Sequence, residues 1–161
     1  MEIQNFNSKD SQNLVDFFNE TSQITGTNKE ISLTLFLQRL NMPSVTAEED
    51  YFIARVNSKI VGVLEMINES PISRAVAIQT IPHSNIEKEV LEQLTKEALA
   101  YSQKKSLSVL HMQSTLGDEV ASSSLTPTGF TKVKTYLELE WQGGILQNLL
   151  LPENYRIRPF L

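Results

Sequence analysis

Residues 74–113, RAVAIQTIPHSNIEKEVLEQLTKEALAYSQKKSLSVLHMQ, decide the fold of this chain. They begin with an apolar run that favours a buried strand, turn at Pro82 and continue into a long helix over 85–104. Residues 106–113 then predict a second strand with few charges, as expected near the centre of a sheet. One face of the helix carries an apolar stripe, made of Ile86, Val90, Leu94 and Ala98. Because strands joined through a helix run parallel, the stretch predicts a parallel step within a mixed α/β sheet.

The rest of the chain predicts strands and helices on both sides of this unit. Further strands are expected at 2–6, 51–56, 60–67 and 133–141, and further helices at 8–21, 31–41 and 117–125. Asn57-Ser58-Lys59 between two apolar runs is typical of a hairpin. Ser8 and Asp118 are the expected N-caps of the first and last of these helices, and Leu35 is expected on the apolar face of the second.

The composition is that of an ordinary globular domain. The chain has 161 residues, of which 40% are hydrophobic and 20% are charged. Its net charge of −5 and its scattered basic residues argue against nucleic acid as a partner. It has no cysteine, which excludes disulfides and thiolate metal sites and fits a reducing compartment. No signal-peptide region or membrane-length apolar run is present, so we expect a cytoplasmic protein without a membrane partner.

The character of the chain changes after Trp141. Residues 142–161 contain a Gly-Gly pair, a short apolar run and a proline turn. Their end repeats, in Ile157 and Phe160, the Ile-x-x-Phe pattern of Ile3 and Phe6. Two interpretations stay open, an edge strand of this sheet or a linker leading to the first strand of a second copy of the domain. We therefore divide the chain into a domain over 1–141 and a tail over 142–161.

Four segments are similar, in their order and spacing, to parts of a known family. They are DYFIARVNSKIVGVLEM (50–66), AVAIQTIPHS (75–84), EALAYSQKKSLSVLHMQ (97–113) and GDEVASSSLTPTGFTKVKTYLELEW (117–141). Together they resemble the GNAT N-acetyltransferase family over about residues 1–141. The resemblance implies a GNAT-like acyl-CoA N-acyltransferase fold, a twisted mixed β-sheet flanked by helices that splays in its middle. It also implies acetyl transfer from acetyl-CoA to an amine, without a metal.

The resemblance places coenzyme A at the junction between the central strand and the long helix. It implies that pantetheine pairs at Thr80 and Ile81, and that the pyrophosphate lies against Glu89, Val90 and Leu91. The family has an Arg or Gln and two glycines in this loop. Here Ile86, Glu89 and Leu91 stand at those positions, and no glycine occurs from residue 63 to residue 114.

The start of the long helix argues further against a phosphate site. Ser84 and Glu87 form a Ser-x-x-Glu pattern, which predicts a capping box that uses N–H groups internally. Glu87 and Glu89 place carboxylates at the positive end of the helix dipole, which stabilises the helix by about 0.3–1 kcal/mol each and repels a phosphate. The sequence therefore favours an ordinary capped helix and doubtful acetyl-CoA binding.

Candidate catalytic residues are few. Glu65 is the best carboxylate of the central strands for a general base, and a solvent-facing strand residue is its alternative role. Leu125 stands where the resemblance implies a tyrosine general acid, and leucine cannot donate a proton. Tyr136 is expected to pack within the last strand, His111 to be a satisfied core histidine, and His83 to be exposed. Two histidines at this spacing predict no metal site.

Three functions stay open. The leading hypothesis is a GNAT-like domain that is degenerate in cofactor binding and has a structural or interface role, beside a second such domain or in a homodimer. The second is an active acetyltransferase with a divergent loop, Glu65 as base and an amine substrate. It requires a splayed cleft with free N–H groups over 84–90. The third is a non-enzymatic binding module that uses the same cleft.

Overall fold

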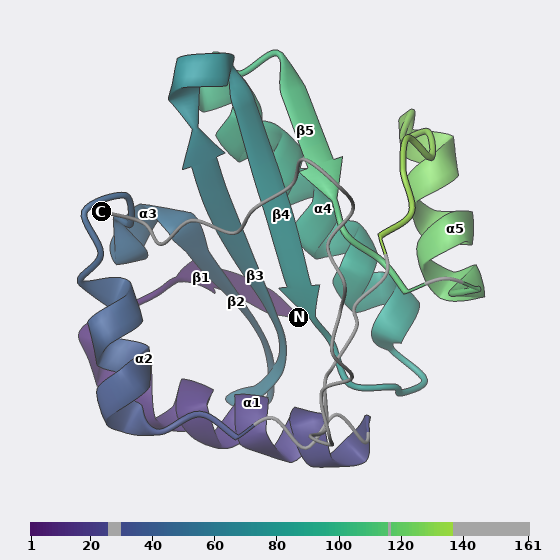
Figure 1. Cartoon of the computed structure of the whole chain (residues 1–161). Helices are drawn as coiled ribbons and strands as arrows, with labels where there is room; N and C mark the ends of the chain where they lie inside the picture. Colours follow the sequence, from purple (N-terminus) through teal and green to yellow (C-terminus); the bar gives the residue numbers. More distant parts are fainter. Residues whose placement is uncertain (26–29, 116, 137–161) are drawn as a thin grey trace, which may run out of the picture.

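The computed structural model describes residues 1–25, 30–115 and 117–136 of the chain. A five-stranded mixed sheet in the order β1-β2-β3-β4-β5 forms the middle layer, with helices on both faces (Figure 1). The strands are β1 (Glu2–Asn5), β2 (Tyr51–Val56), β3 (Lys59–Glu69), β4 (Arg74–Thr80) and β5 (Val109–Met112). The helices are α1 (Ser11–Ile24), α2 (Leu33–Leu40), α3 (Ala47–Asp50), α4 (Glu87–Lys104) and α5 (Glu119–Leu125).

Strands β1 to β4 form an antiparallel meander, and α4 returns the chain to a parallel β5. The parallel step and the mixed α/β class predicted from the sequence are confirmed. The predicted hairpin also forms, because Asn57 and Ser58 take positive φ values of 49° and 66° in a two-residue turn. Such a turn follows the twist of the two strands it joins.

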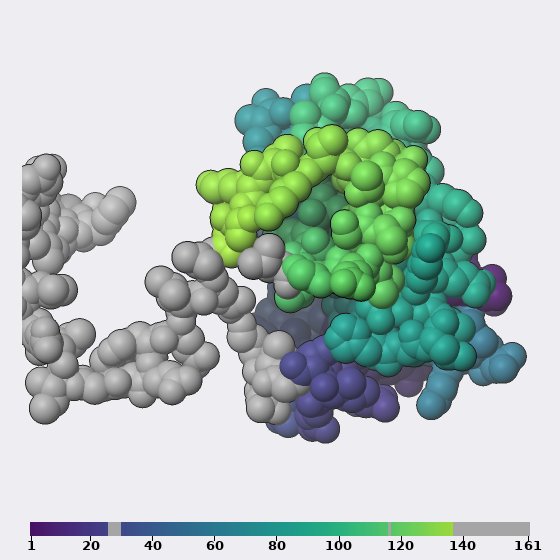
Figure 2. All heavy atoms as spheres, turned by 90° about the vertical axis from the view of Figure 1, so that its right-hand side faces the viewer, coloured from purple at the N-terminus to yellow at the C-terminus, as the bar shows by residue number. Residues whose placement is uncertain are grey.

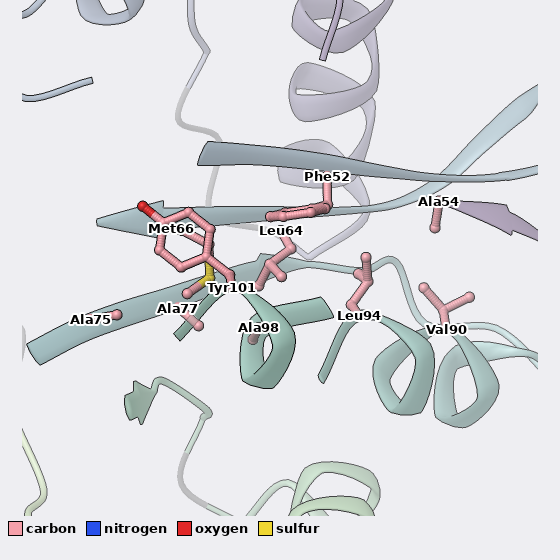
Figure 3. Packing of buried hydrophobic residues seen from close by; sticks show 10 residues of the cluster. All are labelled: Phe52, Ala54, Leu64, Met66, Ala75, Ala77, Val90, Leu94, Ala98 and Tyr101. Atoms are coloured by element: carbon pink, nitrogen blue, oxygen red, sulfur yellow. The ribbon is translucent and has the colours of Figure 1, made fainter. Parts of the chain in front are cut away.

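One core lies between the sheet and α4. Leu64 and Met66 of β3 pack here against the predicted helical stripe, and Val90, Leu94 and Ala98 are fully buried (Figure 3). Gly62 allows the helix to approach β3 closely, because a Cβ at this position would lie 2.5 Å from Cγ1 of Val90. The position of α4, and thus of its N-terminus, is set by this contact.

The second core lies between the other face of the sheet and helices α1 and α2. Phe36 and Tyr51 meet edge to face with ring centroids 6.2 Å apart, and Phe6 packs against both rings. The prediction for α2 was wrong in phase: Leu35 is 54% exposed, and Phe36 is buried in its place. The predicted Ser8 cap was also wrong, because Asn7 caps the 3₁₀ turn that precedes α1.

Two other expectations for the sheet concern the position of β5 and the predicted strand over 133–141. Within the described part of the chain, β5 is an edge strand and not a central one. Residues 133–136 of the predicted last strand form no strand, and 137–141 lie outside the described residues. The tail over 142–161, with its two interpretations, also lies outside them.

Candidate functional site

Strands β4 and β5 separate before β4 ends. Their last paired residues are Ala77 and Met112, followed by one further bond from the Gln113 N–H to the Ala77 carbonyl. Strand β4 continues to Thr80, paired only with β3 on its other side. The strands therefore separate between β4 and the edge strand β5 of the described sheet, whereas the resemblance implied a splay in the middle of the sheet.

Gln79 lies at the point of separation. A continued parallel ladder would join its backbone N–H to the Gln113 carbonyl. Its side-chain Nε2 donates to that carbonyl instead. The Ala77 carbonyl points toward β5, and every second residue of a strand points the same way, so the backbone of Gln79 also faces β5. Its N–H and C=O find no backbone partner there among the described residues, and the split thus exposes a free donor and acceptor.

The N-terminus of α4 opens toward this end of the sheet. Helix α4 starts at Glu87 with Ile86 as its N-cap and has no side-chain cap, so the predicted Ser84–Glu87 capping box is wrong. The helix begins only after Pro82 and the turn that follows it, so Ser84 lies outside the first helical turn. Within residues 81–91, seven backbone amides have no hydrogen-bond acceptor among the described residues, namely those of Ile81, His83, Ser84, Asn85, Ile86, Lys88 and Glu89.

Two glutamates accompany these amides. Glu87 pairs with the exposed His83, whose Nδ1 lies 3.1 Å from the carboxylate Oε2, and the predicted exposure of His83 is confirmed. Glu89 is exposed in the first turn of α4. The free amides and the helix dipole attract an anion at this end, whereas the two carboxylates oppose it.

The five cofactor positions implied by the resemblance differ in whether a ligand could contact them. Thr80 and Ile81 line the groove beside the split. Val90 and Leu91 are buried, and the Val90 amide donates to the Ile86 carbonyl, whereas Leu91 also borders the groove. Only Glu89 of the three helix positions keeps an amide without an acceptor. Sequence reasoning named free N–H groups over 84–90 as the requirement of the divergent-loop hypothesis, although it favoured a capping box that would use some of them.

A groove passes along β4 and β5 on this side of the molecule. Its walls come from the second half of α1, from α5 and from residues 130–136, and Figure 2 shows α5 and the residues after it around a hollow. Val76, Ile78 and His111 are among the residues that line it. Sequence reasoning placed His111 in the core, which was wrong: it is half-buried on β5, faces the groove and makes no hydrogen bond with a described residue.

The other sequence candidates are found in different settings. Leu125 is buried beside Leu91 and Ala121, as expected of an apolar side chain. Tyr136 is 75% exposed, so its predicted packing role was wrong, and Nζ of Lys134 lies 4.6 Å from its ring centroid. Asp118 caps α5 by accepting from the Ala121 N–H at 2.8 Å, as predicted.

Glu65 on β3 is not a free carboxylate. Nη2 of Arg39 lies 2.8 Å from its Oε1 and 2.6 Å from its Oε2, and Ile78 on β4 is its cross-strand neighbour. Its side chain is 13% exposed, so it is not the solvent-facing strand residue considered as its alternative role. Before it could accept a proton from a substrate, Arg39 would have to leave.

The described residues show neither a metal site nor a membrane helix. No group of three or more potential ligands gathers in the described ranges. No helix within those ranges has the length and apolar character needed to cross a membrane.

Solved structures share this architecture, although no protein-family model and no curated protein matches the sequence. A GNAT-family acetyltransferase from Streptococcus pneumoniae is 18% identical with a TM-score of 0.66, over 81% of this chain and 84% of that one. An aminoglycoside antibiotic 6′-N-acetyltransferase from Acinetobacter haemolyticus is 13% identical with a TM-score of 0.58, over 88% and 99%. A transcriptional regulator from Bacillus halodurans is 14% identical with a TM-score of 0.66, over 87% and 99%.

These identities are low, so the likeness establishes the fold. The chain is a mixed α/β protein with the sheet and helices of the acyl-CoA N-acyltransferases. Its fold is that of the GNAT acetyltransferases, as the sequence predicted.

Proposed function

We propose that this chain binds an acyl-CoA thioester, with acetyl-CoA as the first candidate, and transfers its acyl group to an amine. The observation that supports this best is the split between β4 and β5, which opens beside a helix start with unpaired amides. A closed sheet and a capped helix would have left no place for the cofactor. The structure thus favours the divergent-loop hypothesis over the degenerate domain that the sequence favoured.

The backbone would hold the cofactor in this proposal. The N–H and C=O of Gln79 suit the amides of a pantetheine arm, because the arm can take the place of a missing neighbouring strand. The unpaired amides of residues 84–89 suit the pyrophosphate. Thr80 and Ile81 would line the arm, whereas Val90 and Leu91 would support the helix from the core. When bound, the thioester supplies an activated acyl group.

His111 is our candidate for removing the proton of the amine. It stands on β5 opposite Val76, one pair before the strands separate, and it faces the groove. An imidazole changes charge near neutral pH, which suits proton transfer. Glu65, the base suggested by the sequence, has both oxygens engaged by Arg39.

The chain need not supply an acid at the Leu125 position. A thiol has a pKa of about 8.5, so a thiolate is a tolerable leaving group near neutral pH and can take its proton from water. The expected cost is a rate about 10²–10⁴-fold lower than that of an enzyme with a general acid at this position.

Calorimetric titration with acetyl-CoA tests the proposal. We expect weak but measurable binding in the wild-type chain, and about 3- to 30-fold tighter binding in a Glu87→Gln/Glu89→Gln variant. The estimate assumes about 0.3–1 kcal/mol for each charge at a helix N-terminus. A Glu92→Gln/Glu97→Gln variant of the same helix and the same net charge is the matched control.

Two outcomes would overturn the proposal. One is the absence of binding by the Glu87→Gln/Glu89→Gln variant at millimolar acetyl-CoA while the protein remains folded. The other is equal tightening in the control variant, which would indicate a general charge effect. Either result would return the structural or interface role to first place, a role that the edge position of β5 within the described sheet favours.

A further inference from the structure

Arg39 binds Glu65 through a single nitrogen. Nη2 contacts both carboxylate oxygens, at 2.8 Å and 2.6 Å, and the other guanidinium nitrogens make no hydrogen bond with a described residue. A guanidinium usually meets a carboxylate as a fork, with two nitrogens on two oxygens. The end-on arrangement seen here is one that a primary ammonium can reproduce without losing a hydrogen bond.

The phenol of Tyr51 adds a second polar group at the same place. Tyr51 is 1% exposed, it is the cross-strand neighbour of Glu65, and its buried hydroxyl interacts with the Glu65 carboxylate without a well-formed hydrogen bond to a described residue. Burial, and after it the charge of Glu65, raises the pKa of this phenol, so it keeps its proton. Phe6 and Phe36 hold the ring. The phenol oxygen can also accept a hydrogen bond from an ammonium.

The two partners of the ion pair differ in how firmly they are fixed. Glu65 belongs to a central strand and its side chain is 13% exposed, whereas the Arg39 side chain is 45% exposed at the end of α2. Ion pairs with such exposure contribute little to stability. Arg39 can therefore turn into solvent at little cost, while Glu65 stays in place.

The groove passes close to Glu65 without including it. The cross-strand neighbour of Glu65, Ile78, lines the groove, as do Phe18 and Thr80. These side chains offer a largely apolar path next to the carboxylate. An amine on an apolar stem fits this combination, because the stem would cover the path and the ammonium would meet the carboxylate.

We propose that Glu65 and Tyr51 form a binding site for a primary ammonium, called the seat below. The Arg39 guanidinium occupies this site until a ligand displaces it. The ligand would be a cationic amine on an apolar stem. That this amine is also the acyl acceptor rests on the proposed function. Binding at the seat itself needs no acetyl-CoA. Glu65 then anchors the ligand, and proton removal is left to another group.

The test uses n-hexylamine as the probe and 1-hexanol as its neutral control, both titrated without acetyl-CoA and followed by amide NMR shifts. We expect hexylamine to shift residues of β3 and β4, and hexanol not to. An internal competitor that fills the site about four times in five weakens apparent affinity by about fivefold. Arg39→Ala should therefore bind hexylamine about fivefold more tightly than the wild type.

Control variants separate the seat from a general charge effect. Lys96→Ala removes one exposed cation from α4 and should leave the affinity for hexylamine unchanged. Glu65→Gln keeps the shape of the side chain and should abolish the preference for hexylamine over hexanol. Tyr51→Phe should weaken hexylamine binding while the protein remains folded.

The proposal fails if Arg39→Ala binds hexylamine no more tightly than Lys96→Ala does, or if both probes bind equally. The comparison of those two surface variants decides the question even if Glu65→Gln or Tyr51→Phe does not fold. Because acetyl-CoA is absent, a failure here leaves the cofactor titration untouched. If the cofactor titration failed instead, Glu65 and Tyr51 could still bind an ammonium, but acyl transfer to that amine would no longer be proposed.

Discussion

At the scale of single residues, Gly62 determines how closely α4 lies against the sheet. A Cβ at this position would stand 2.5 Å from Val90 Cγ1 and 3.3 Å from Leu94 Cδ1. Valine is branched at Cβ and has few alternative rotamers, so the helix itself would have to move. The same contact positions the start of α4, and therefore the amides that the proposed cofactor site uses.

Gly62→Ala is expected to lower the free energy of unfolding by about 1–3 kcal/mol, the usual cost of overpacking a core. Urea denaturation of the variant and the wild type measures the loss. Val90→Ala supplies the partner for a double-mutant cycle, because it removes the methyl that the new Cβ would meet. Losses that add in the double variant would contradict the close contact, whereas a double loss smaller than the sum would support it.

At the scale of elements, a buried hydrogen bond joins α3 to the end of α4. Asp50 is 4% exposed, and its carboxylate accepts from the Tyr101 hydroxyl at 2.7 Å and from the Thr46 N–H at 2.6 Å. Lys105 and Glu49 form an ion pair beside this bond. The contacts connect the turn before β2 to the helix that carries the proposed site at its other end.

Tyr101→Phe should lower the free energy of unfolding by about 1–3 kcal/mol, since it leaves a buried carboxylate with one donor fewer. Thermal or urea unfolding at neutral pH measures this loss. A matched control is Tyr136→Phe, because Tyr136 is 75% exposed and its hydroxyl has no buried partner to lose. Equal stability of the two variants would show that the Asp50 bond is not stabilising.

The same hydroxyl gives a dependence on alkaline pH. Burial, and next the hydrogen bond to Asp50, raises the pKa of Tyr101 above the ordinary value of 10.0. Above that pH the unfolded chain loses this proton while the folded chain keeps it, so stability falls as the pH rises. Unfolding free energies measured between pH 8 and 11 should fall less steeply in Tyr101→Phe than in the wild type, and parallel slopes would contradict the assignment.

The sequence predicts most elements of the described fold, because periodicity and turn residues are local signals. The stripe of Val90, Leu94 and Ala98 and the turn at Asn57 and Ser58 were predicted for that reason. The phase of α2 was not, because α2 is rich in leucine, and packing against Tyr51 selected Phe36.

The site was harder to predict because it depends on where elements stop. Ser84 and Glu87 have the spacing of a capping box, but the helix starts at Glu87 itself and leaves Ser84 in the turn. The position of His111 depended on β5 being at the sheet edge, which no local pattern indicates. The pairing of Arg39 with Glu65 joins positions 26 residues apart and gave no sequence signal.

At the scale of the whole molecule, the described chain has a firm part and a looser part. Strands β1 to β4 are paired in an antiparallel meander with one core on each face. Strand β5 adds a short parallel edge, with Val109 42% exposed, and α5 packs through a cluster with only Ala121, Leu125 and Leu91 buried. Few buried apolar groups hold the looser part, so we expect it to open separately.

Native-state hydrogen exchange can measure this difference. Amides of β5 and α5 should exchange through openings that cost clearly less than global unfolding, whereas the amides at the centre of β3 should exchange only with it. Addition of acetyl-CoA should slow exchange in β5, at the Gln79 amide and at the start of α4, because a ligand in the split would join the two parts. Exchange of β5 and β3 at the same free energy would contradict the division. If acetyl-CoA slowed exchange only at the α4 amides, the ligand would lie at the start of the helix and its pantetheine arm would not lie between β4 and β5.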